Sequence, residues 1–164
     1  MAATYTPIAS ITLGAATSSV TFNSIPQTYT DLILIYNGTS GIVNLPVRFN
    51  SDTGSNYSYT RMYADGSGTA SDRESNLTYA VYAIGSSERT FATIHINNYS
   101  NTTTNKTLLG RGGYTGTGYV SVFVSMWRNT AAITSIILYG HSNFSTNFSV
   151  GSTFNLYGIL AGNA

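Results

Sequence analysis

Charge is the property that this sequence most lacks. Only 8% of the residues are charged and the formal net charge is +1, whereas about a quarter of the residues of an ordinary soluble domain are charged. Lys and Arg are scattered, so the chain has no basic surface of the kind that binds nucleic acid or anionic lipid. We therefore expect neither a nucleic acid nor a membrane among its partners.

Cysteine is absent altogether, which excludes disulfides and thiolate metal sites. The two histidines, His95 and His141, lie too far apart along the chain for a zinc-binding pattern. No apolar run approaches the length of about 18 residues that spans a membrane. Residues 1–7 have neither the basic nor the apolar region of a secretory signal. We expect no metal or other cofactor, and synthesis in a host cytoplasm without a cleaved leader.

Catalytic patterns are also missing. Nucleophilic catalysis needs a base within reach of an activated hydroxyl or thiol, and no serine lies in a Gly-x-Ser-x-Gly elbow. His95 alternates with Ile94 and Ile96, so it faces outward if those two face the core. All acidic residues except Asp31 lie in expected loops, where no apolar surroundings would raise the pKa of one carboxyl of a pair. We predict that the protein is not an enzyme.

Ser, Thr, Asn and Tyr dominate what is present, with 13 Tyr, and both Tyr and Thr favour strands. Helical periodicity is nearly absent, whereas two-residue alternation and short apolar runs recur between turn residues. Strands are expected near residues 8–13, 18–22, 31–37, 43–50, 57–63, 77–84, 91–98, 105–111, 118–128, 133–139 and 153–160. About ten short strands predict an all-β, antiparallel sandwich or barrel, and the length fits one domain over residues 1–164.

Individual segments allow finer expectations. The apolar run over residues 31–36 predicts a central strand covered on both faces. Residues 119–127 alternate, with Val120, Val122, Val124 and Met126 on one face and Tyr119, Ser121, Phe123, Ser125 and Trp127 on the other. The last strand, over 153–160, is expected beside an early strand, which would hold both ends of the chain.

The segments between the expected strands include two long loops and a hairpin turn. Residues 64–76 are polar and hold several of the charges, so we expect a long surface loop. Residues 140–152 form a second loop, and the glycines of 110–118 predict a hairpin turn. Residues 1–7 are a candidate for an extended N-terminal arm.

Aromatic and Arg side chains supply the candidate contacts with a partner. One strand has four of them at the same parity, another ends in two, and the loop over 140–152 has two without strand context. They are Tyr57, Tyr59, Arg61, Tyr63, Trp127, Arg128, Phe144 and Phe148. Such residues dominate protein-binding hot spots, and exposed aromatic faces also bind sugars, so a protein partner and a glycan both remain open. For Phe144 and Phe148, packing back onto the core is an equal alternative.

Six segments together resemble a recurrent small virion protein of tailed bacteriophages, in particular those of cyanobacteria and other aquatic bacteria. The segments are Tyr5–Gly14, Ile25–Leu34, Arg48–Arg61, Asn98–Leu108, Met126–Ile136 and Gly151–Ile159. The resemblance implies a jelly-roll-like β-sandwich that forms a homotrimer and has no catalytic residues. It also implies one of two roles, a capsid decoration (cement) protein or a module of a tail or fibre.

A chain without a fibre shaft fits the decoration role better than the fibre role. The expected location is the virion, and the expected partners are further copies of the chain and the major capsid protein or other virion proteins. Binding to the assembled lattice but not to loose subunits would stabilise the capsid. The alternative is a glycan- or receptor-binding module of a phage tail or fibre.

Overall fold

Antiparallel β-sheets account for the regular structure of the chain. The computed structural model describes residues 4–39, 45–83, 88–116, 118–141 and 143–160, and these contain strands and no helix. A helix long and apolar enough to cross a membrane is accordingly not found in the described ranges. The expected all-β class is confirmed.

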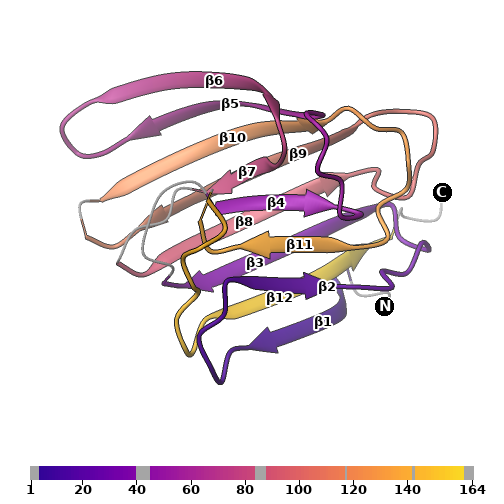
Figure 1. Cartoon of the computed structure of the whole chain (residues 1–164), viewed down its shortest axis with the longest axis horizontal. Helices are drawn as coiled ribbons and strands as arrows, with labels where there is room; N and C mark the ends of the chain where they lie inside the picture. The colour runs from indigo at the N-terminus through magenta and orange to yellow at the C-terminus, as the bar shows by residue number, and fades with distance from the viewer. Residues whose placement is uncertain (1–3, 40–44, 84–87, 117, 142, 161–164) are drawn as a thin grey trace.

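The strands form two sheets (Figure 1). The larger sheet has eight strands, in the order β1 (Thr6–Thr12), β12 (Thr153–Ile159), β3 (Asp31–Gly38), β8 (Thr90–Asn97), β9 (Lys106–Tyr114), β10 (Tyr119–Trp127), β5 (Tyr57–Ala64) and β6 (Thr69–Leu77). The smaller sheet has four, in the order β2 (Ser19–Phe22), β11 (Ile136–Tyr139), β4 (Leu45–Phe49) and β7 (Ala80–Ala83).

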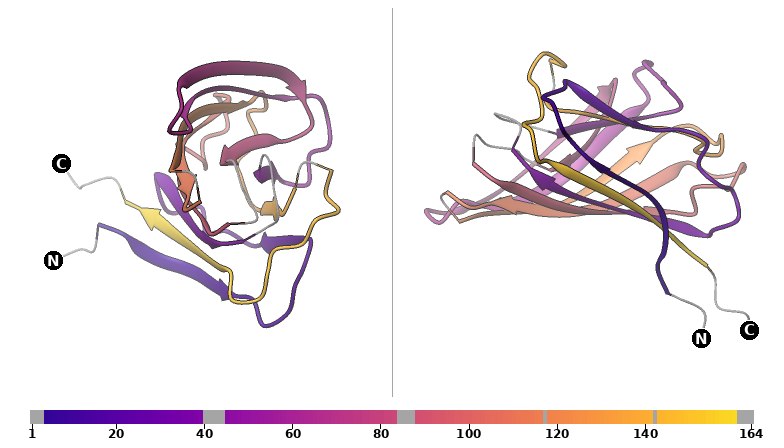
Figure 2. Two further views of the ribbon diagram at one scale, coloured as in Figure 1. Left: turned by 90° about the vertical axis from the view of Figure 1, so that its left-hand side faces the viewer. Right: turned by 90° about the horizontal axis from the view of Figure 1, so that it is seen from below.

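The smaller sheet packs against one face of the larger one, and the core lies between them (Figures 1 and 2). Two-residue alternation places the inward side chains. On β3 these are Leu32, Leu34 and Tyr36, and on β12 they are Phe154 and Leu156. Each strand of the smaller sheet contributes side chains to the same core. The arrangement is a two-layer β-sandwich, in which the larger sheet extends beyond the smaller one.

Pairing between β1 and β12 holds the two ends of the described chain together. Thr6 pairs with Gly158 and Thr12 with Thr153, so the expectation that the last strand lies beside an early one is confirmed. Of the expected N-terminal arm, residues 1–3 lie outside the described residues. Just before β1, the ring of Tyr5 packs edge-on against Tyr157, with 6.4 Å between the ring centroids.

The long loop expected over residues 64–76 is wrong, because most of it is strand β6. Asp65 forms the turn before it by accepting hydrogen bonds from the backbone of Ser67 and Gly68, and β6 then pairs with β5 over its whole length. A strand at the edge of a sheet needs no apolar face, and charged residues there discourage pairing with other chains. A surface loop and an edge strand therefore share the same polar composition, and composition alone does not distinguish them.

Two further expectations need correction. Strand β3 is not covered on both faces, since Ile35 on the outer face is exposed. Gly112 and Gly113 lie within β9 and not in the hairpin turn, which falls between Tyr114 and Tyr119. A Cβ atom at Gly113 would lie 2.3 Å from the carbonyl oxygen of Tyr119, so close packing of the backbone explains that glycine.

Candidate functional site

The row of candidate contacts on β5 faces the core. Tyr57, Tyr59 and Arg61 are buried and Tyr63 is partly buried. They share one face, as their parity predicts, and on that face Tyr57 and Tyr59 pack against residues of the smaller sheet. Tyr59 packs with Val81 of β7 and Phe123 of β10 in a small second cluster. The row therefore forms interior structure and not an exposed site.

Arg61 forms an ion pair with Asp72 within the larger sheet. Its Nε donates to Asp72 Oδ1 at 2.9 Å, and its Nη2 donates to Asp72 Oδ2. The guanidinium carbon also lies 4.7 Å from the centre of the Tyr63 ring. This charge is thus compensated by the β5–β6 hairpin, and the ion pair joins the edge strand to its neighbour.

Trp127 and Arg128 organise the end of β10. The Trp127 side chain is 1% exposed, and its ring stacks on Tyr57 with a centroid distance of 6.2 Å. Its indole Nε1 donates to Asp52 Oδ2 at 2.7 Å. Arg128 donates to Ser58 Oγ at 3.0 Å and to the carbonyl oxygen of Tyr57 at 3.3 Å. Both residues hold the loop before β5 in place.

Asp52 is the acceptor at the centre of that loop. Burial by itself would raise the pKa of this carboxyl, but hydrogen bonds from Trp127, Asn56 and Gly54 outweigh it, and the pKa lies below its ordinary value. The three donors favour the carboxylate form because an ionised oxygen accepts hydrogen bonds more strongly. The arrangement is structural, since Asp52 has no base or nucleophile among these contacts.

The two phenylalanines of the loop over 140–152 fold back onto the protein. Phe148 is fully buried, with its ring 4.8 Å from that of Phe154 and 5.5 Å from that of Tyr36. Phe144 is partly buried and packs at 4.4 Å against Tyr139. Of the two alternatives for these residues, packing onto the core is the one observed.

The surface that sequence reasoning missed is the opposite face of the larger sheet, which we call the outer face. On β10 the side chains of Val120, Val122 and Val124 are 53%, 51% and 52% exposed. The alternation within 119–127 is confirmed, but the aliphatic row faces solvent and the row containing Phe123 and Trp127 faces the core. The bulky rings fill the space between the sheets, which valines would leave partly empty.

Apolar side chains continue across the outer face on both sides of β10. They are Met62 on β5, Phe91 on β8, Leu109 on β9 and Ile35 on β3, all exposed. A monomer rarely exposes apolar side chains over so many adjacent strands. The outer face is therefore the candidate interaction surface of this protein.

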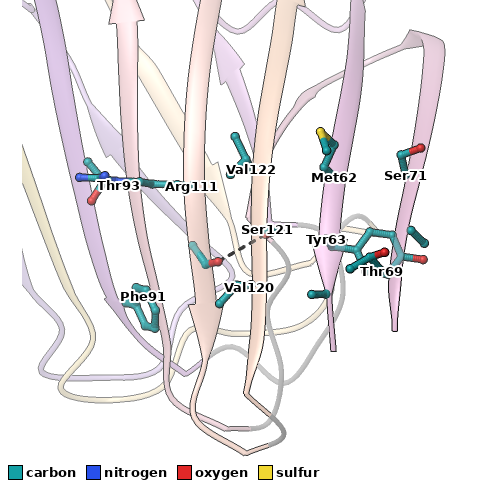
Figure 3. A pocket seen from close by; sticks show the side chains of 13 residues that line it. Met62, Tyr63, Thr69, Ser71, Phe91, Thr93, Arg111, Val120, Ser121 and Val122 are labelled. Atoms are coloured by element: carbon teal, nitrogen blue, oxygen red, sulfur yellow. Dashed lines mark hydrogen bonds between the residues drawn. The ribbon is translucent and has the colours of Figure 1, made fainter. Parts of the chain in front are cut away.

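Two open hollows lie side by side on the outer face. The first, of about 680 Å³, lies over β8, β9, β10, β5 and β6, and Figure 3 shows Phe91, Val120 and Met62 around it. The second, of about 690 Å³, lies over β12, β3, β8, β9 and β10 and includes Leu109. They share three lining residues, Thr93, Arg111 and Val122.

Charged groups are few on this face. His95 faces outward, as expected, with Nε2 at 3.0 Å from Asp31 Oδ2, and Asp31 Oδ1 also accepts the backbone N–H of Asn98 at 2.6 Å. Arg111 lies between the hollows, and no described carboxylate contacts it. The described residues also contain no group of three or more His, Cys, Asp or Glu that could hold a metal ion.

No protein-family model matches the chain, and no curated protein is significantly similar to it.

Proposed function

We propose that the protein is a structural component of a virus particle, a capsid decoration protein that binds and stabilises the assembled lattice. The observation that carries this proposal is the outer face, a broad exposed surface with apolar side chains on β3, β8, β9, β10 and β5. A surface of this kind fits binding to another protein, because burying apolar area is the main favourable contribution to association. The resemblance to small phage virion proteins supplies the biological setting.

The fold that we propose for this role is a jelly roll with two inserted hairpins, β5–β6 and β9–β10. Outside these hairpins, β1, β3, β8 and β12 lie in the larger sheet and β2, β4, β7 and β11 in the smaller one, so the chain crosses between the sheets at most steps. If both hairpins are set aside, the larger sheet has the order β1–β12–β3–β8 and the smaller sheet the order β2–β11–β4–β7. Paired four-stranded sheets of this order support a jelly roll, an architecture frequent in viral capsid and lectin domains.

The proposed mechanism is mass action. A protein that binds the closed shell but not its dissociated subunits lowers the free energy of the shell by an amount set by its affinity and concentration. A homotrimer would contact several capsid subunits at once, so modest single contacts would add up to a long-lived attachment. No bond is made or broken in this process, which agrees with a site built from aliphatic side chains.

Three measurements test the proposal. Quantitative mass spectrometry of purified particles should find the chain in hundreds of copies, and sedimentation of the isolated protein should give a trimer. The recombinant chain should also co-sediment with shells that lack it and should not bind the dissociated major capsid protein. Equal binding to shells and to loose subunits would contradict the decoration mechanism.

A low copy number would support the alternative, a glycan- or receptor-binding module of a tail or fibre. The aromatic row of β5, a candidate sugar-binding surface in the sequence, is buried or partly buried and does not support that alternative. A glycan array would then identify any sugar that the protein binds.

A further inference from the structure

We propose that the outer face binds a protein surface that presents a carboxylate to Arg111, with an apolar protrusion on either side of that carboxylate. This inference deepens the proposed function by naming the chemistry of the partner. It rests on the proposed function only in treating the outer face as the binding surface.

Arg111 is the first observation behind it. The residue lies on β9, near the middle of the larger sheet, with β8 on one side and β10 on the other. Its exposed guanidinium is flanked by its two uncharged register partners, Thr93 and Val122. Such a group forms strong, geometrically specific pairs with carboxylates once water is excluded.

The hollows on either side of Arg111 are the second observation. Thr93, Arg111 and Val122 form the boundary between them. Phe91 and Val120 line the first hollow (Figure 3), and Leu109 lines the second. A partner that seats two apolar groups in these hollows would carry its carboxylate directly above the boundary. The geometry thus favours a partner surface in which an acidic residue lies between two apolar ones.

The extent of the face favours a protein over a small molecule. At the usual spacing and rise of strands, the five central strands cover about 500 Å² and all eight cover about 900 Å². A standard protein interface buries about 800 Å² on each partner. Small-molecule sites, by contrast, enclose most of their ligand, and the hollows here are open to solvent on the sheet surface.

A second copy of the chain, packed face to face, is a poor occupant. It would bring another Arg111 to the interface and no carboxylate to pair with it, because Asp31 is the only described acid on the strands' outer face and already binds His95 and Asn98. Burying an unpaired guanidinium is costly. The carboxylate must therefore come from a different surface.

The test uses the full chain and needs no virus particle. A yeast-displayed library of random peptides is selected on the wild-type protein, and the enriched sequences are measured as synthetic peptides against variants. The main variant is Arg111→Glu. The matched control is Arg73→Glu, which makes the same charge change on the same face but on the edge strand β6, outside both hollows. Val122→Asp, which places a carboxylate beside Arg111, is a second variant should Arg111→Glu not fold.

We expect the enriched peptides to carry Asp or Glu flanked by apolar residues. Arg111→Glu or Val122→Asp should weaken their binding about 30-fold or more, the usual consequence of breaking a buried charge pair. Replacing the peptide's acid by its amide should have the same effect, and Arg73→Glu should have almost none. Absence of any enriched peptide, enrichment of peptides without an acid, or equal losses for Arg73→Glu and Arg111→Glu would overturn the inference.

Two other occupants are distinguished by parallel measurements. Self-association in sedimentation equilibrium that Val122→Asp abolishes would assign the face to a second copy and overturn the inference. Binding to oleate vesicles that Arg111→Glu abolishes would assign it to a lipid, with the same consequence. Because all arms use the isolated chain, failure of the protein to bind viral shells would contradict the proposed function and leave these results unaffected.

Discussion

Removal of the Asp52 carboxylate by Asp52→Ala should lower the free energy of unfolding, mainly because the buried indole N–H of Trp127 loses its hydrogen-bond acceptor. This carboxylate accepts three hydrogen bonds, from Trp127 Nε1 at 2.7 Å, from Asn56 Nδ2 at 2.9 Å and from the backbone N–H of Gly54 at 2.8 Å. It thereby joins the end of β10 to the loop that precedes β5.

The expected decrease in the free energy of unfolding depends on whether each donor can bind water once the carboxylate is gone. The donors on Gly54 and Asn56 are in a partly exposed loop and can turn to water, so their loss costs little. Trp127 is 1% exposed and held between Tyr57 and Phe49, so its indole N–H cannot reach water without movement of the core. An unsatisfied buried donor costs about 1–3 kcal/mol, and we expect Asp52→Ala to lower the free energy of unfolding by about 2–3 kcal/mol.

The assay is urea unfolding followed by the fluorescence of Trp127, the only tryptophan of the chain, and by circular dichroism. The control is Asp65→Ala, which also removes a carboxylate that accepts backbone hydrogen bonds in a loop, but a fully exposed one. If the two variants unfold at the same urea concentration, the reasoning about the buried indole is refuted.

Three further predictions follow from the same structure. Because the pKa of Asp52 is lowered in the folded state, its contribution to stability is present above the unfolded-state pKa and is lost as the pH falls through the folded-state pKa. Wild type should therefore lose more stability than Asp52→Asn in urea titrations between pH 5 and pH 2, and parallel losses would contradict this. Phe123→Ala should lower the free energy of unfolding by about 3–5 kcal/mol and Val124→Ala by less than about 0.5 kcal/mol; similar costs in denaturant melts would mean that the faces of β10 are assigned incorrectly. Gly113→Ala should cost about 1–3 kcal/mol because its new Cβ would meet backbone that cannot move aside, whereas Gly68→Ala, with open space around it, should melt close to the wild-type temperature.

The two-residue periodicity of strands explains which expectations from the sequence were confirmed. Strict alternation in residues 119–127 separates two sets of side chains whatever surrounds the strand, so the two faces of β10 were predictable. The outward direction of His95 followed in the same way from Ile94 and Ile96. Alternation says nothing about which set is buried, however, and the tyrosine row of β5 was expected outside although it lies inside.

Local sequence therefore determined the class of structure, the positions of most strands, and which side chains of a strand lie on the same face. These properties depend on two-residue periodicity and on turn residues. Only the tertiary structure decided which face of the larger sheet the smaller sheet covers. That choice depends on the combined volume of side chains from strands far apart in sequence, and Phe123, Trp127 and Tyr57 fill the space between the sheets better than valines would. Since the buried and exposed rows follow from this packing, so does the position of Arg111 among the exposed valines, and with it the candidate interaction surface.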